Sequence, residues 1–258
     1  MMGRCLRALL VANVVACGSF GTAPPPPGEN DASTPANEAG VPDDGGTSPG
    51  TTDGGGSCTP RPTFEDPFER PPAQLTQRYA EKKEENGSLA IATGTPLMGS
   101  ALAVTLNAGT TDGYATLRRD LSPASCPLVV SLQLYTPAFP TGSGAKTTLV
   151  RVQFPTGQLE LVMNGQGKLE IVDDPDDASS VHYPMPLMVT INERTSIKLT
   201  MDTTKRSVVC DLHQGGTTQT SMVSFKTPYQ DAMNVHIGAY DFDSVASLTY
   251  YIDNLVIE

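Results

Sequence analysis

The sequence of 258 residues has no tryptophan, only three histidines and no basic cluster larger than an adjacent pair. Its formal net charge is −11 at pH 7, so the chain offers no basic surface for a nucleic acid, and nucleic-acid binding is excluded. The sequence also lacks an apolar run of the roughly 20 residues that cross a bilayer. We therefore expect any attachment to a membrane to use an anchor other than a membrane-spanning helix.

The N-terminus carries a short apolar run behind two basic residues. Arg4 and Arg7 precede the run over residues 8–16, which only Asn13 interrupts. A basic segment, a short apolar segment and a small residue before the break are typical of a secretory signal peptide, here residues 1–16. The alternative is a frayed N-terminal helix of a cytosolic protein, but no soluble fold requires this arrangement.

The residues at the break, Val14, Val15, Ala16 and Cys17, resemble the lipobox of bacterial lipoproteins. The resemblance implies that Cys17 is acylated, for example with palmitate, and becomes the mature N-terminus. Each methylene that enters a membrane contributes about 0.8 kcal/mol, so several acyl chains anchor a protein. Gly18 stands where aspartate would favour the inner membrane. We therefore expect a lipid anchor in the bacterial cell envelope, at the outer membrane or the cell surface.

Residues 18–57 consist mainly of Pro, Gly, Ser, Thr, Ala, Asn and acidic residues, with no Lys or Arg. Phe20 and Val41 are the only bulky apolar side chains, too few to offset the entropy lost on ordering the segment. We expect residues 17–57 to be the acylated cysteine and a disordered tether, which prolines and charge of one sign extend. Residues 58–258 remain, a common length for a single β-sandwich domain.

Three cysteines, Cys58, Cys126 and Cys210, remain for this domain, so at most one disulfide forms within it. No C-x-x-C pair or histidine cluster accompanies them, which argues against a metal site. We favour a disulfide between Cys126 and Cys210. If "LVVSLQLY" and "SVVCDL" are antiparallel neighbours, the start of one strand lies beside the end of the other. Cys58–Cys126 is the alternative.

From residue 88 onward, short β-favouring runs alternate with turn residues. Period-two alternation is clear in Leu132 and Leu134 and again in Val150, Val152 and Phe154, and Gly, Pro, Asn and Asp occupy the gaps. The one helical candidate, "PAQLTQRYAEKKEENG", has no convincing apolar stripe and fits a surface turn. Many short strands without intervening helices predict an all-β fold of two antiparallel sheets packed as a sandwich.

Three segments of the second half resemble strands of concanavalin A-like lectin/glucanase domains, which are laminin-G-like: "SIKLTMDTTKRSVVCDLHQGG", "VHIGAYDF" and the terminal "YYIDNLVIE". "FEDPFER" (residues 64–70) is similar to the first strand of exported members, which pairs with the last strand. The resemblance implies a jelly-roll sandwich over most of residues 58–258. Two features depart from the family: Ser196 and Ile197 replace an aromatic before the central hairpin, and the E-x-D-x-x-E strand of glucanase members is absent.

A retaining glycosidase needs two carboxyl groups about 5–5.5 Å apart, which on a strand means acids two or four positions apart. The nearest spacings are Glu65 with Glu69, Asp241 with Asp243, and Glu160 with Glu170 on separate strands. Glu65 and Glu69 lie on either side of Pro67, and we expect them at the solvent-exposed start of a strand rather than in a cleft. No nucleophile motif occurs, and "TGSGAKTT" lacks a glycine and the strand–helix context of a phosphate loop. We therefore predict no catalytic residues and no enzyme activity.

Two acidic segments are candidates for a cation such as Ca²⁺, which prefers carboxylate and carbonyl oxygens. In the domains that the sequence resembles, the loop with Asp241 and Asp243 lies at the sandwich rim, so these residues are candidate calcium ligands or turn caps. "DDPDD" (residues 173–177) lacks the glycine and glutamate of an EF-hand loop, and a solvated hairpin loop fits it better. The three histidines lack the spacing of metal ligands, and no other cofactor is indicated.

Sugar binding favours aromatic rings beside polar side chains. Tyr135, Tyr183, Tyr240 and Tyr250 are candidate platforms, although tyrosines in strands are as often core residues. The leading hypothesis is an envelope-anchored lipoprotein whose non-catalytic jelly roll binds glycan, such as a polysaccharide, or another extracellular ligand. A structural or adhesion component that binds a surface protein is the first alternative. A degenerate glycoside hydrolase or polysaccharide lyase is the second.

Overall fold

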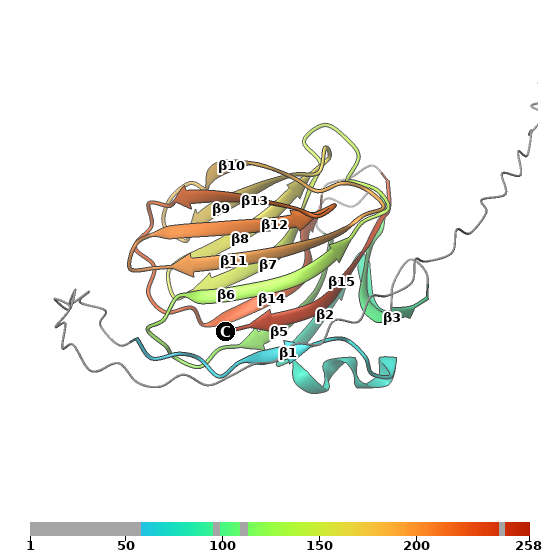
Figure 1. The fold of residues 1–258 in the computed structure, drawn as a ribbon, viewed down its shortest axis with the longest axis horizontal. Helices are drawn as coiled ribbons and strands as arrows, with labels where there is room; N and C mark the ends of the chain where they lie inside the picture. The colour runs from blue at the N-terminus through green and yellow to red at the C-terminus, as the bar shows by residue number, and fades with distance from the viewer. Residues whose placement is uncertain (1–57, 95–98, 109–112, 243–245) are drawn as a thin grey trace, which may run out of the picture. The chain divides into compact units, whose positions relative to one another are not determined.

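The computed structural model describes residues 58–94, 99–108, 113–242 and 246–258, which form two antiparallel β-sheets packed face to face (Figure 1). The predicted all-β jelly-roll sandwich is therefore confirmed. One short 3-10 helix, η1 (Pro72–Arg78), is the only helix in these four ranges. No helix within them is both long and apolar enough to cross a membrane.

Each sheet mixes strands that are far apart in sequence. The eight-stranded sheet has the spatial order β13 (Thr217–Ser224), β12 (Ser207–Gln214), β11 (Arg194–Asp202), β6 (Leu128–Tyr135), β15 (Leu248–Ile257), β4 (Ser100–Leu106) and β3 (Gly87–Thr93), with β1 (Phe64–Asp66) added to β15. The seven-stranded sheet has the order β10 (Val181–Met188), β9 (Lys168–Pro175), β8 (Gly157–Asn164), β7 (Lys146–Phe154), β14 (Asn234–Phe242), β5 (Gly113–Asp120) and β2 (Glu81–Glu85).

The core lies between the two sheets and takes the inward-facing residues of each strand. In β6, Val130, Leu132 and Leu134 are buried and alternate with half-buried residues, as period two predicts. Val152 and Phe154 of β7 face the same core from the other sheet. Full burial of one such side chain contributes about 1.5–3 kcal/mol, so this shared apolar layer holds the sheets together.

The first strand pairs with the last one, as the family resemblance implied. Phe64 lies opposite Ile257, and Asp66 lies opposite Leu255. Figure 1 shows this N-terminal arm running along β15. The arm brings the start of the domain to the eight-stranded sheet.

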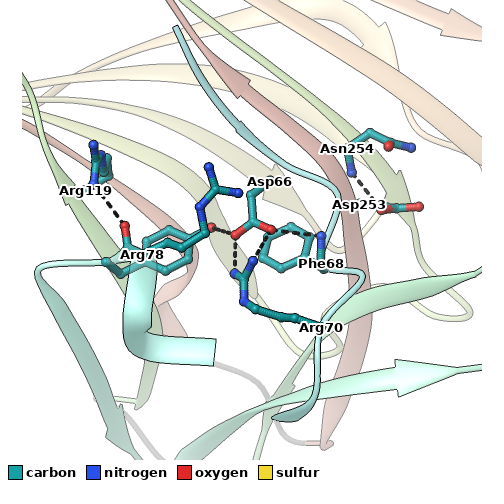
Figure 2. Close-up of polar contacts among 8 residues, drawn as sticks. Asp66, Phe68, Arg70, Arg78, Arg119, Asp253 and Asn254 are labelled. Atoms are coloured by element: carbon teal, nitrogen blue, oxygen red, sulfur yellow. Dashed lines mark hydrogen bonds and ion pairs between the residues drawn. The ribbon is translucent and has the colours of Figure 1, made fainter. Parts of the chain in front are cut away.

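Asp66 holds this arm in place from a fully buried position. Arg70, the Tyr79 hydroxyl at 2.6 Å and the Phe68 N–H at 2.9 Å all donate to its carboxylate (Figure 2). Burial opposes ionisation of Asp66, but these hydrogen bonds outweigh it and hold the pKa of Asp66 below its ordinary value. Since every donor comes from the same short segment, the cluster closes the turn after β1 and serves the fold.

The segment over residues 72–87 differs from the predicted surface turn. It forms η1 and then β2, an edge strand that pairs with β5. All five residues of β2, "EKKEE", are charged, so apolar alternation gives no sign of a strand there. Charged side chains on an edge strand discourage pairing with another chain, which explains this composition.

The favoured disulfide is wrong, and the alternative is present. Cys58 is bonded to Cys126, with their Cα atoms 4.9 Å apart. Cys126 precedes β6 and Cys210 lies on β12, but β11 separates these two strands in the sheet. The strand adjacency behind the Cys126–Cys210 prediction therefore does not exist. Cys210 is a buried free thiol, and burial raises its pKa to about 12.

Candidate functional site

A row of long polar side chains crosses the outer face of the seven-stranded sheet. Strand pairing places five residues opposite one another, on β2, β5, β14, β7 and β8 in turn: Glu81, Arg118, His236, Arg151 and Glu160. Their strand neighbours Leu117 and Ile237 belong to the core, so the five side chains point away from it. We call these five residues the polar row.

The centre of the polar row is buried although it faces outward. Arg151 and Glu160 are each only 7% exposed, and Arg151 Nε donates to Glu160 Oε1 at 2.7 Å. The Thr148 hydroxyl donates to the other carboxylate oxygen at 3.2 Å. Burying two charges costs several kcal/mol per ion, and apolar residues of the same size are often at least as stable. Folding alone therefore gives little reason for this pair.

His236 lies between Arg118 and Arg151 and is 9% exposed. Neither of its ring nitrogens has a hydrogen-bond partner among the described residues. Burial, together with the positive charges of Arg151 and Arg118, lowers the pKa of His236 to about 4. The imidazole is therefore neutral at pH 7, with one nitrogen that can donate and one that can accept. A ligand group that reached this ring would find both functions unused.

Two tyrosines lie beside the polar row. The rings of Tyr114 on β5 and Tyr240 on β14 are stacked, with centroids 5.7 Å apart and 18° between their planes. The guanidinium carbon of Arg151 lies 3.3 Å from the centroid of the Tyr240 ring, a cation–π contact. Together, the rings and the row place aromatic faces next to hydrogen-bonding groups.

Gly238 separates His236 from Tyr240 on this face. A Cβ at Gly238 would lie 2.2 Å from the Ala115 carbonyl oxygen, and the φ of +121° is one that other residues rarely adopt. Only glycine therefore fits where β14 approaches β5 this closely. As a consequence, β14 itself contributes no side chain between the imidazole and the tyrosine ring.

Two hollows extend the face toward β10. One, of about 160 Å³, is lined by Glu160, Asp174 and His182 among others. The other, of about 650 Å³, lies against the loop before β7 and is lined by Asn164 and Glu170 among others. Lys146 lines both hollows, so they are neighbours at this residue, and we call the pair the groove.

The side chains of the two predicted calcium ligands lie outside what the structure describes. Asp241 lies in β14 at the edge of what the structure describes, and Asp243 lies outside the described residues. Calcium binding at these two positions stays a prediction. Within the described ranges, no three His, Cys, Asp or Glu side chains gather closely enough to hold a metal ion.

The acidic segment "DDPDD" is not simply a solvated loop. Asp173 and Asp174 belong to β9, and Asp173 is buried, accepting a hydrogen bond from the Tyr229 hydroxyl at 2.7 Å. Asp174 accepts from the Gln158 amide at 2.8 Å, and only the last two aspartates occupy the following turn. These contacts are structural, because the first two carboxylates already have partners inside the domain.

Three of the other acids singled out from sequence also have partners, whereas Glu65 is exposed on β1. Glu160 pairs with Arg151, while Glu170 contacts Lys146 Nζ at 3.4 Å and His182 Nδ1 at 3.2 Å. Glu69 accepts the Ser100 N–H at 2.9 Å.

The predicted tyrosines are divided among different environments. Tyr240 lies beside the polar row, Tyr135 faces outward on the other sheet, Tyr183 packs against the core and Tyr250 is fully buried within it. Sequence reasoning missed Tyr114, Arg118 and Arg151. In the sequence they appear only as charged or aromatic residues at alternate positions of "YATLRRD" and "TLVRVQF". This pattern indicates a site only once β14 is known to lie between those two strands.

Neither a protein-family model nor a curated protein matches the chain. Among solved structures, it is similar to a cellulose-induced protein, Cip1, with 14% identity and a TM-score of 0.55 over 76% of this chain and 96% of that one. It is also similar to alginate lyase vAL-1 from Chlorella virus, with 9% identity and a TM-score of 0.50 over 72% and 96%. The receptor-binding domain of botulinum neurotoxin type G shares 11% identity with this chain, with a TM-score of 0.43. The match covers 68% of this chain and 42% of the neurotoxin chain. At these identities, the likeness to Cip1 and to the alginate lyase shows the fold alone.

Proposed function

We propose that this domain binds glycan, without catalysis, along the outer face of the seven-stranded sheet. The observation that carries the proposal is the stacked pair Tyr114 and Tyr240, held by Arg151 and placed beside the unpartnered ring of His236. An aromatic face packs against the apolar side of a sugar ring, and adjacent donors and acceptors bind its hydroxyls. An alginate lyase shares the fold, which is compatible with a polysaccharide ligand.

A glycan array probed with the detergent-solubilised full chain tests this proposal. Tyr240→Ala should lower the affinity for every bound glycan by about tenfold or more, because it removes a stacking ring. Tyr240→Phe keeps the ring and should stay within about threefold of the wild-type affinity. Absence of any binding, or equal affinities for Tyr240→Ala and wild type, contradicts the proposal.

We also propose that the chain is held in the cell envelope by acylation of Cys17. The support is the "VVAC" break and the polar segment behind it, both of which lie outside the described residues. Replacing Cys17 by Ser should move the protein from the membrane fraction to the soluble fraction and abolish metabolic labelling with a palmitate analogue. Unchanged fractionation of Cys17→Ser contradicts the anchor.

A degenerate or active polysaccharide lyase is the second candidate, and His236 is the observation that favours it. Its neutral imidazole has ring nitrogens without a hydrogen-bond partner in the described part of the chain, and one of them can accept a proton from a sugar bound beside it. Incubating the full chain with alginate and with pectate should then produce the ultraviolet absorbance of unsaturated uronates, and His236→Gln should abolish it. If no such absorbance appears, the lyase candidate is wrong and the binding proposal stands alone. If a surface-protein library is bound instead of glycan, the adhesion alternative replaces both.

A further inference from the structure

We propose a second glycan site, for a neutral oligosaccharide, on the outer face of the eight-stranded sheet. Two hollows flank Gln133 there, and the smaller, of about 10 Å³, has room for no more than one water molecule. The larger has a volume of about 300 Å³, the lower end of the usual range for small-ligand pockets. None of the residues that line them belongs to the polar row, so this site does not depend on the function proposed above.

Short side chains create the larger hollow. Ser131 on β6 and Ser196 on β11 lie on adjacent strands and face outward, between the longer side chains of Gln133 and Lys198. In the register, Gln133 is opposite Ser196, and Lys198 is opposite Ser131. The two serines therefore lie on a diagonal and form a low floor with hydroxyl groups on it, while amide and ammonium groups stand at the rim.

A β-bulge forms one wall of the hollow. The pairing of β15 with β6 shifts register between Asp253 and Val256, and Asn254 has a φ of +48° within this bulge. A bulge leaves a residue unpaired and re-aims its side chain, and Asn is one of the few non-glycine residues that tolerate this conformation. Asn254 lines the hollow and is exposed, so its amide is available to a ligand.

An aromatic pair borders the smaller hollow. Tyr135 and Tyr251 lie opposite each other on β6 and β15, with ring centroids 6.0 Å apart and 47° between their planes. Both line the hollow that begins at Gln133. The face thus combines half-buried rings with hydroxyl and amide groups across the three adjacent strands β11, β6 and β15. Aromatic rings and hydrogen-bonding groups are the two chemical features that a sugar ring needs.

The charges around this face indicate that the ligand is neutral. Arg194 and Lys198 supply two positive charges, and Asp211 and Asp253 supply two negative charges. A polyanion or a polycation would meet as much repulsion as attraction on such a surface, and mismatched charges disfavour a partner. Hydroxyl-rich neutral sugars can use the donors and the acceptors alike.

Titration calorimetry on the detergent-solubilised full chain tests the site, with cellohexaose, maltohexaose and chitohexaose as probes. At least one probe should bind. Ser196→Tyr fills the hollow and Gln133→Ala removes the group common to both hollows, and each should lower the affinity about tenfold or more. Thr200→Tyr adds the same ring to the outer face of the same strand, outside both hollows, and should stay within about twofold. Circular dichroism confirms that all variants fold.

The two glycan proposals fail in different ways. If no probe binds, or if Ser196→Tyr and Gln133→Ala both bind as tightly as wild type, the second site is wrong. If Tyr240→Ala abolishes binding of the same probe while Ser196→Tyr does not, that probe occupies the polar row and the second site is again wrong. Loss in Ser196→Tyr and in Gln133→Ala, with Tyr240→Ala unaffected, supports the second site and leaves the polar row to be judged by its own ligands.

Discussion

The two outer faces of the sandwich obey the same alternation but bury their polar residues to different depths. On the seven-stranded sheet, Arg151, Glu160 and His236 are all at most 9% exposed. On the eight-stranded sheet, the outward residues of β6 are half-buried and Lys198 is exposed. Period two determines which side a residue faces, but its depth depends on the side chains of the neighbouring strands.

The difference has a local cause. In the polar row, long side chains stand next to one another on five successive strands and cover each other, with the Tyr240 ring over Arg151. On the other face, the serines at positions 131 and 196 interrupt such coverage and leave hollows. Buried charge costs stability and is therefore not explained by folding. For this reason, the outer face of the seven-stranded sheet is the stronger candidate for a functional site than the outer face of the eight-stranded sheet.

The largest effect should come from breaking the buried ion pair. Arg151→Met leaves Glu160 buried without its main cation and should lower the free energy of unfolding by about 3–5 kcal/mol. Lys198→Met, on the outer face of the other sheet, should change it by no more than about 0.5 kcal/mol. Urea denaturation followed by circular dichroism measures both. Similar losses in the two variants would remove the contrast between the faces.

Removing the disulfide tests how far the eight-stranded side depends on its N-terminal arm. Cys58 and Cys126 are 68 residues apart, so their bond stabilises the domain by about 4 kcal/mol in the chain-entropy model. Cys58→Ser should lose about that amount. Cys210→Ala, which removes a buried thiol but no bond, should lose clearly less. Non-reducing peptide mapping should show a linked peptide with Cys58 and Cys126; a link to Cys210 would contradict the structure.

A pH titration of stability should single out His236. Its pKa is about 4 in the folded chain and 6.5 in an ordinary environment, so between these values the unfolded chain binds more protons. The stability from its neutral ring is complete above pH 6.5 and is lost as the pH falls to 4, by about 3 kcal/mol. His236→Gln should flatten this part of the curve. An unchanged curve for His236→Gln would contradict the burial of His236.

The smallest effect is expected at the exposed end of the same face. Glu170→Gln removes a partner of Lys146 and His182, but those side chains are 42% and 45% exposed. Partly exposed ion pairs contribute about 0–1 kcal/mol, so the free energy of unfolding should change by less than 1 kcal/mol. Thermal denaturation at low and high salt measures the change. A loss as large as that of Arg151→Met would mean that depth does not govern these pairs.

The sequence by itself determined the fold class and several elements. Alternating apolar residues in "LVVSLQLY" or "SIKLTMD" are sufficient to predict a strand and its buried side, because period two reflects the geometry of one strand. The predicted pairing of the "FEDPFER" strand with the last strand was confirmed by the contact of β1 with β15. The sequence did not predict β2, because this charged edge strand has no buried residue and therefore no apolar pattern.

Only the tertiary structure decided which strands are neighbours, and the errors and the candidate site both depend on that. Cys126 bonds with Cys58 because β11 lies between β6 and β12, an order that no local pattern contains. In the same way, Arg118, His236 and Arg151 are far apart in sequence and become adjacent because β14 lies between β5 and β7. Hydrogen bonds between strands join residues of any sequence separation, so the position and depth of the polar row follow from sheet order and not from spacing along the chain.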